Sequence, residues 1–343
     1  MYYNNRDIRI EEYPIPEIKS DELLLKMVAC GICGSDVMEW YRVKSAPRVL
    51  GHEVSGIIEK VGENVHDFQE GDRVVVTHHV PCNTCKLCRS GHETACELLH
   101  KTNFYPGGFS EYIRIPAINI ERGMLRLPDT MTFEEGTFIE PLGCVVRAQR
   151  IAQLKSGQTV LILGSGIAGL LHIKLAKING AGKIFATDIN ERRLNAAKAM
   201  GADITIHAND NVVERLKEYN NNELADIVIV CAGVNEVIEH SFSYVNKGGT
   251  ILFFAPLRPE TRVPFPMFDL WRNDVTITNS YGAVLKDLKT AMELIHSGRI
   301  NVKDMITHIL PLEETAKGFR LVEEGKESIK VIIRSFVNGT TKG

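Results

Sequence analysis

Apolar and polar positions follow two different patterns along the chain. Between residues 21 and 116, short apolar runs at 22–28, 54–61 and 73–77 are interrupted by Gly, Pro and Asp. Such runs predict β-strands joined by irregular loops. Residues 134–152 carry apolar positions at helical spacing and predict a helix with one buried face. The N-terminal part is therefore expected to be mostly β.

From about residue 156, apolar strands and amphipathic helices alternate regularly. The sequence predicts strands at 159–163, 183–187, 203–206, 226–231, 250–254 and 275–278, and helices at 168–178, 191–200 and 234–244. Strands separated by helices of this length predict an α/β fold with a doubly wound parallel sheet.

The last part of the chain leaves this alternation. A helix after residue 285, a strand at 306–311, a helix at 315–323 and a strand at 328–333 are predicted. The tail at 335–343 is expected to be disordered, as chain ends often are.

Composition excludes several classes of protein. The 343 residues suffice for two domains with separate cores. A net charge of −3, without long runs of one sign, gives no reason to expect binding to nucleic acid or an anionic membrane. No apolar stretch approaches the ~20 residues of a membrane span, and the polar N-terminus lacks the apolar core of a signal peptide. A cytoplasmic protein is expected.

A strand, a glycine-rich turn and a helix follow one another after residue 159. The turn Gly164-Ser165-Gly166-Ile167-Ala168-Gly169 has the spacing G-x-G-x-x-G of dinucleotide-binding proteins. Gly164 would form the tight turn, Gly166 would let a pyrophosphate approach the backbone, and Gly169 would let helix and strand pack closely. The helix N-terminus, with Ile167 and Ala168, would offer free N–H groups to the phosphates.

An acidic residue closes the second strand of this part. Asp188 follows the turn at about the 20-residue distance expected of the carboxylate that binds the adenosine ribose. A carboxylate there favours NAD over NADP, because it would repel the 2′-phosphate. Arg193, which we also assign to the cofactor site, and Arg192 leave NADP open, because arginine can accept that phosphate.

Four of the eight cysteines lie in one polar loop. Cys82, Cys85, Cys88 and Cys96 have the spacing C-x2-C-x2-C-x7-C, which suits a closed tetrahedral zinc site better than a disulfide framework. An iron–sulfur run would need its fourth cysteine after three residues, followed by proline. Glu97 follows instead, so structural zinc is predicted, with four unliganded thiols as the alternative.

Three further segments offer ligands of different types. Cys33-Gly34-Ser35-Asp36, Gly51-His52-Glu53 and Glu140-Pro141 bring one sulfur, one nitrogen and several carboxylate oxygens. A catalytic zinc uses such a set while it keeps one position for substrate.

Together these motifs resemble the zinc-containing medium-chain alcohol dehydrogenase family, in its sorbitol (polyol) and threonine dehydrogenase-like branch. The resemblance also covers residues 51–56 and 71–74 and extends over nearly the whole chain. It implies a GroES-like catalytic domain over 1–152, completed by 286–343, and a Rossmann NAD-binding domain over 153–285. It further implies one catalytic and one structural zinc per chain, and a homo-oligomer, either dimer or tetramer.

The resemblance assigns roles at the catalytic site. Cys33 and His52 would ligate the catalytic zinc, and Glu140 would be the third ligand, with Glu53 beside the metal as an alternative. Asp36 would orient His52, as metal-bound imidazoles usually require. Cys144 is an alternative zinc ligand to these residues; the other interpretation is a buried helical cysteine that binds no metal.

Proton transfer is expected to start at Ser35, which would take the proton of the alcohol. Many relatives carry a histidine five residues after the cysteine ligand, and this chain has Met38 there. The outer relay would then use water or another group, such as His78 or His79.

The expected reaction is hydride transfer from a small secondary alcohol (a polyol, cyclitol or sugar alcohol) to NAD, giving a ketone. Val80-Pro81-Cys82 resembles polyol dehydrogenases, whereas Ser280-Tyr281 and His79 resemble L-threonine 3-dehydrogenases, the alternative. A zinc-free quinone reductase would lack Cys33, His52 and the four-cysteine loop. A non-enzymatic zinc-binding protein would leave the nucleotide motif unexplained.

Overall fold

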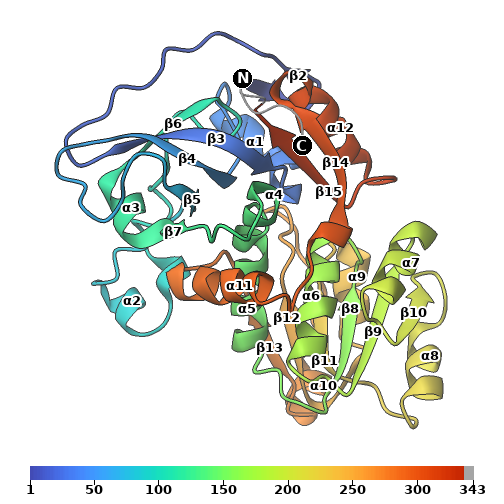
Figure 1. Ribbon diagram of the computed structural model, residues 1–343. Helices are drawn as coiled ribbons and strands as arrows, with labels where there is room; N and C mark the ends of the chain where they lie inside the picture. Colours follow the sequence, from blue (N-terminus) through green and yellow to red (C-terminus); the bar gives the residue numbers. More distant parts are fainter. Residues whose placement is uncertain (336–343) are drawn as a thin grey trace. The chain divides into compact units, whose positions relative to one another are not determined.

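The computed structural model describes residues 1–335 (Figure 1). Contacts divide the chain into unit 1, Met1–Gly143 with Ala283–Gly343, and unit 2, Cys144–Gly282. The boundary between Gly143 and Cys144 lies inside helix α5 (Ile139–Ile151), whereas the sequence predicts a domain boundary just after this helix. Of the tail predicted to be disordered, residues 336–343 lie outside the described residues. Ser335 is buried, and its N–H donates to the Val28 carbonyl over 3.2 Å.

Unit 1 is built on a seven-stranded mixed sheet with the order β14-β15-β3-β4-β5-β7, to which β6 is added through β3. Its strands are β3 (Leu23–Gly31), β4 (Glu53–Val61), β5 (Arg73–Val76), β6 (Tyr112–Ile115), β7 (Met124–Arg126), β14 (Ile306–Pro311) and β15 (Lys330–Arg334). A separate two-stranded sheet pairs β1 (Tyr2–Asn4) with β2 (Asp7–Ile8). The N-terminal part is therefore mostly β, as predicted.

The helices of unit 1 are short, apart from those near the C-terminus. They are α1 (Glu39–Arg42), α2 (Lys86–Arg89), α3 (Ala117–Gly123), α4 (Phe133–Gly136), α11 (Leu285–His296) and α12 (Thr315–Glu324). The predicted single helix at 134–152 is wrong, because α4 and α5 are separate. Pro141 explains the break: it has no N–H to donate, and its ring would clash with the carbonyl of residue 137 in a continuous helix.

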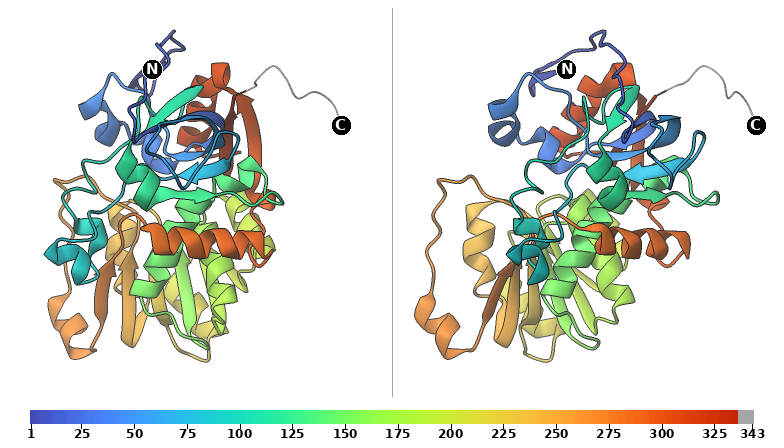
Figure 2. Two further views of the ribbon diagram at one scale, coloured as in Figure 1. Left: turned by 60° about the vertical axis from the view of Figure 1, so that its left-hand side comes forward. Right: turned by 90° about the vertical axis from the view of Figure 1, so that its left-hand side faces the viewer.

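Unit 2 has six parallel strands in the order β10-β9-β8-β11-β12-β13. They are β8 (Thr159–Leu163), β9 (Lys183–Asp188), β10 (Ile204–His207), β11 (Ala225–Val230), β12 (Val245–Phe253) and β13 (Thr276–Asn279). The helices between them, on both faces of the sheet (Figure 2), are α6 (Ile167–Ile178), α7 (Glu191–Ala199), α8 (Val212–Tyr219), α9 (Asn235–Ser241) and α10 (Met267–Arg272). The predicted doubly wound parallel sheet is confirmed. None of the described helices is long and apolar enough to span a bilayer.

The strand order reverses at β8. The chain proceeds from β8 to β9 and β10 on one side and then crosses to β11 on the other. In open α/β sheets, ligands bind at the carboxyl ends of the strands at such a switch point. The glycine-rich turn follows β8 directly and therefore lies at this position.

The glycines of this turn have different environments. Gly164 has a φ of +95°, which favours glycine. A Cβ on Gly169 would lie 2.0 Å from the Gly164 carbonyl oxygen, whereas a Cβ on Gly166 would meet no atom within 4 Å. Gly169 is thus required for packing inside unit 2, and Gly166 leaves open space beside the turn.

Gly169→Ala is expected to lower the free energy of unfolding of unit 2 by about 1–3 kcal/mol, because the methyl group would push helix α6 away from the turn. Gly166→Ala is the matched control and should cost less than about 1 kcal/mol. Urea denaturation followed by circular dichroism measures both. Equal losses for the two variants would contradict this assignment.

Candidate functional site

The carboxylate of Asp188 is fixed beside the glycine-rich turn. It is buried at the end of β9; its Oδ2 accepts from the N–H of Ser165 over 2.8 Å and its Oδ1 accepts from the N–H of Asn190 over 3.0 Å. Nη1 of Arg193 lies 3.8 Å from Oδ2. These contacts connect Asp188 to the turn through Ser165, and Arg193 to the turn through Asp188.

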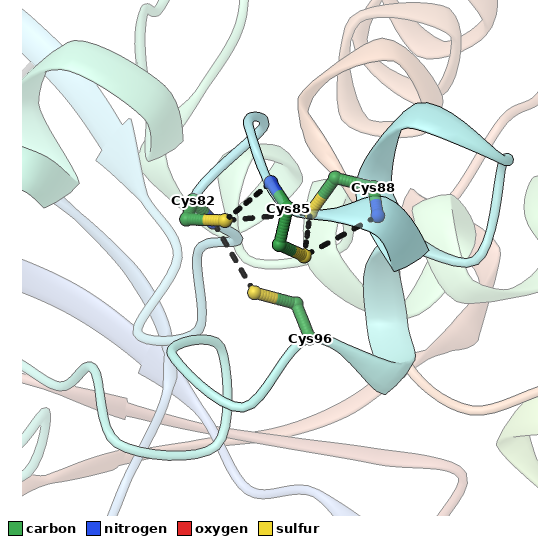
Figure 3. A group of neighbouring side chains, drawn as sticks. All are labelled: Cys82, Cys85, Cys88 and Cys96. Atoms are coloured by element: carbon green, nitrogen blue, oxygen red, sulfur yellow. Dashed lines mark hydrogen bonds between the residues drawn. The ribbon is translucent and has the colours of Figure 1, made fainter.

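The four cysteines of the loop converge on one point (Figure 3). The four sulfur atoms all lie within 4.8 Å of one another, so the group can hold a metal ion. Backbone N–H groups point at the sulfurs: that of Cys85 donates to Cys82 over 3.2 Å and that of Cys88 to Cys85 over 3.5 Å (Figure 3). Such donors stabilise thiolates, the form that binds metals.

The cysteine pKa values show why this group needs a cation. Hydrogen bonds from Thr84, and then from Cys85, lower the pKa of Cys82 to about 5. Burial and the hydrogen bonds among the neighbouring sulfurs raise the pKa of Cys88 to about 12. Four thiolates would repel one another, and a divalent ion at their centre would offset this repulsion.

The four-cysteine loop is packed against the segment that begins α11. Val284 belongs to the same buried cluster as Cys88, Cys96 and Leu99. Nζ of Lys286 lies 2.5 Å from a carboxylate oxygen of Glu93. The C-terminal part of unit 1 therefore holds this loop in place.

Strand pairing brings together the second candidate metal-binding group, which consists of Cys33, His52 and Glu53. β3 and β4 are antiparallel, with Gly31 opposite Glu53, so Cys33 just beyond β3 faces the start of β4. Ligand atoms of Cys33, His52 and Glu53 lie within 4.8 Å of one another and can hold a metal ion. The structure does not include Glu140 in this group, although Glu140 and Glu53 line the same cavity.

Asp36 is fully buried behind His52. Its Oδ1 lies 3.4 Å from His52 Nδ1, and its Oδ2 accepts from the N–H of Cys33 over 3.1 Å. Burial by itself would raise the pKa of this carboxyl, but His52 and Arg42 hold it below its usual value. An ionised Asp36 can therefore fix the ring of His52.

Ser35 has a partner that the sequence interpretation missed. Its Oγ accepts a hydrogen bond from Nη2 of Arg42 over 2.8 Å. His78 lies beside His52, with ring centroids 4.8 Å apart, and His79 lies beside His78, with ring centroids 3.8 Å apart; both pairs of rings are tilted. Burial lowers the pKa of His79 to about 4, so its ring is neutral at pH 7.

Lys330 is a second residue that the sequence interpretation missed. Its Nζ pairs with Oε2 of Glu53, and both side chains are only 1% exposed. The ammonium also lies 5.5 Å from the ring centroid of Phe138. The sequence does indicate a buried partner for Lys330, because this lysine begins an apolar strand and a buried ammonium group requires a counter-charge.

Lys330→Met is expected to lower the free energy of unfolding of the metal-free protein by about 3–5 kcal/mol, because Glu53 would lose its buried counter-charge. The loss should be smaller after metal loading, since a cation beside Glu53 would replace the ammonium. Urea titrations with and without a chelator measure both values.

Lys317→Met is the matched control for this variant. Lys317 pairs with Glu314, but the two side chains are 53% and 43% exposed, so the change should stay within about 0.5 kcal/mol. An equally small effect of Lys330→Met would show that Glu53 is not held as a buried charge.

Comparisons with known proteins agree with this geometry. The family model described as alcohol dehydrogenase GroES-like domain matches residues 19–129, and that described as zinc-binding dehydrogenase matches residues 168–297. The predicted GroES-like fold of the N-terminal part is thereby confirmed.

Relatives match over almost the whole chain. A probable D-xylulose reductase A of Neosartorya fischeri is 35% identical, covering 95% of this chain and 93% of the relative. A sorbitol dehydrogenase of Gallus gallus is 34% identical, covering 96% and 93%. The crystal structure of a putative zinc-binding dehydrogenase from Sinorhizobium meliloti 1021, bound to NADP, matches with a TM-score of 0.87 and 28% identity, covering 97% of each chain.

Sequence, fold and relatives thus agree on an oxidoreductase with a GroES-like part and a Rossmann-like parallel sheet. The chain belongs to the zinc-containing medium-chain dehydrogenases, in the family of the polyol dehydrogenases.

Proposed function

We propose that this dehydrogenase oxidises a secondary hydroxyl group of a polyol, cyclitol or sugar alcohol to a ketone, with NAD as the hydride acceptor. The observation that carries the proposal is the convergence of Cys33, His52 and Glu53, with Ser35 next to this group through its N–H, which donates to the Cys33 sulfur. The substrate class rests on the sorbitol and D-xylulose relatives, which favour a polyol over L-threonine.

The donor set fits zinc at both ligand groups. Four sulfurs suit a closed structural site, and one sulfur, one imidazole and one carboxylate suit a catalytic site with an open position. The geometry favours Glu53 as the third ligand, with Glu140 beside it in the shared cavity. Bound zinc would supply Lewis-acid stabilisation of the alkoxide at neutral pH.

The residues around the metal group have distinct tasks. The N–H of Ser35 donates to the sulfur of Cys33 over 3.4 Å, which places this residue at the ligand group, and we assign to its hydroxyl the task of taking the proton of the alcohol. Asp36 orients the imidazole of His52. Lys330 balances the charge of Glu53 within the buried interior of unit 1.

Unit 2 supplies the groups for the nucleotide. The G-x-G-x-x-G turn at the switch point, with open space beside Gly166, supports a dinucleotide. The buried carboxylate of Asp188 supports NAD, because it would meet the 2′-phosphate of NADP with its negative charge. Arg193 beside it, and the NADP bound by the Sinorhizobium relative, make a comparison of the two cofactors necessary.

The first experiment measures NADH or NADPH formation with polyols, cyclitols, simple secondary alcohols and L-threonine. We expect NAD-dependent turnover of a polyol or cyclitol. Cys33→Ser should lower kcat about a thousandfold, because several kcal/mol of charge stabilisation would be lost. It should also reduce the zinc content from two ions per chain to one.

Cys144→Ala is the matched control and should keep both zinc ions and full turnover, because Cys144 lies outside both ligand groups. Turnover of L-threonine alone would keep the mechanism and replace the substrate class. Full activity of Cys33→Ser would refute the catalytic metal group.

The protein is also expected to form a homo-oligomer, either a dimer or a tetramer, and to lie in the cytoplasm. Within unit 2, β13 is the last strand of the sheet. Four large apolar side chains nearby in sequence are strongly exposed: Phe265, Met267, Phe268 and Trp271. An open sheet edge and exposed aromatic groups favour a self-complementary interface.

Trp271→Glu is expected to shift the protein toward the monomer, because Trp271 is 70% exposed and would place a charge in this interface. Light scattering after size exclusion measures the mass. Tyr219→Glu, a change of an exposed aromatic residue on α8, is the control and should leave the mass unchanged. An unchanged mass for both variants would exclude this surface.

A further inference from the structure

We infer that Arg42 is a positioning residue, which holds Ser35 and Asp36 in their working places through one guanidinium group. The inference rests on the proposed function, in which Ser35 takes the alcohol proton and Asp36 orients His52. Arg42 is the last residue of α1, and its side chain is only 13% exposed.

The guanidinium makes three contacts with two consecutive residues. Nε donates to the carbonyl oxygen of Ser35 over 2.9 Å, and Nη2 donates to the Ser35 hydroxyl over 2.8 Å. The same Nη2 lies 3.3 Å from Oδ1 of Asp36. The planar fork of an arginine can reach all three acceptors at once, which an ammonium group cannot do.

The contact with Ser35 fixes the role of its hydroxyl. An arginine side chain donates hydrogen bonds and accepts none. The bond from Arg42 therefore occupies a lone pair of Ser35 Oγ and leaves the O–H free to point toward another oxygen. Arg42 is already protonated and cannot accept a proton, so the proton that leaves Ser35 has to pass to a group other than this guanidinium.

This arrangement differs from relatives that carry a histidine in place of Met38. A methionine cannot relay protons, and the hydrogen-bond partner of the Ser35 hydroxyl in this chain is Arg42. Neither His78 nor His79 has a hydrogen bond to Ser35 in the described part of the chain; Nδ1 of His79 lies 3.0 Å from the carbonyl oxygen of Thr102. The guanidinium thus fixes the position of the hydroxyl, and neither histidine accepts its proton through a direct hydrogen bond in the described residues.

The contact with Asp36 extends to the ligand group. Oδ1 of Asp36 lies between Nη2 of Arg42 and Nδ1 of His52, at 3.3 and 3.4 Å. Because Asp36 is fully buried, it has no water to replace a lost partner. Removal of Arg42 should therefore loosen both the hydroxyl and the imidazole.

The test compares Arg42→Met and Arg42→Lys in the zinc-loaded enzyme. Both should lower kcat about 10- to 100-fold, the usual cost of losing a residue that supports a metal ligand, with KM for NAD unchanged. In a Ser35→Ala background, Arg42→Met should lower kcat by a smaller factor than in the wild type, because only the contact with Asp36 remains to be lost and residues that act as a unit are not additive. A Lys variant with wild-type kcat, or full additivity, would overturn the inference.

A second readout does not depend on turnover. With cobalt in the catalytic site, Arg42→Met should shift the visible absorption bands and weaken cobalt binding about 10- to 100-fold, because His52 loses its fixed orientation. An unchanged spectrum and affinity would refute the part of the inference that concerns Asp36. This measurement remains decisive even if no alcohol is turned over, an outcome that would refute the proposed function instead.

Arg48→Met is the matched control. Arg48 lies in the same segment, is also partly buried and is reached by the charge of Asp36, but its side chain donates to Ser45 Oγ over 3.4 Å and forms no hydrogen bond or ion pair with Ser35 or Asp36 among the described residues. This variant should retain kcat, the cobalt spectrum and the fold. An equal loss in Arg48→Met would show that any lost arginine disturbs the segment and would overturn the specific role of Arg42.

Discussion

The carboxylate of Glu53 is buried in the interior of unit 1, where its charge requires a neutralising partner. A buried charge is tolerated only with a close partner. Lys330 provides this partner from β15, a strand that the chain reaches only after unit 2 is complete. The pairing of β15 with β3, and of β3 with β4, then fixes Glu53 beside Cys33 and His52. One ion pair therefore connects the last strand of the sheet with the ligand group of unit 1.

The two ligand groups use the backbone in different ways. The four-cysteine loop is local, and short turns place N–H groups on its own sulfurs. The group of Cys33, His52 and Glu53 is assembled by strand register, so its geometry depends on the whole sheet. A local site can be recognised from spacing alone, whereas an assembled site requires the register of the sheet.

This difference explains how far the sequence could be interpreted. The alternation of strands and helices predicted the parallel sheet of unit 2, because its strands are buried on both faces and read as apolar runs. Helix α8 was missed because its sequence is largely charged and only Val212 and Leu216 are buried. The break between α4 and α5 was missed although Pro141 marked it. The apolar strand around Lys330 indicates that this lysine is buried with a partner, but the identity of the partner, Glu53, depends on the sheet and could not be predicted. The contact of Arg42 with Ser35 depends on the fold of the short helices after Cys33, which no apolar periodicity describes.

The ion pair between Glu53 and Lys330 also has a consequence for synthesis on the ribosome. The two residues are separated by 277 positions, and translation at about 5–20 residues per second would emit them roughly 15 to 55 s apart. During this interval unit 2, which is continuous in sequence, can fold by itself, and the cysteine loop can already capture its metal. The sheet of unit 1 remains incomplete until β15 emerges. A nascent chain therefore lacks the β15 partner of residues 29–31 in β3 for most of its elongation, although β4 and β6 already pair with this strand, and a chaperone would protect this short unpaired segment.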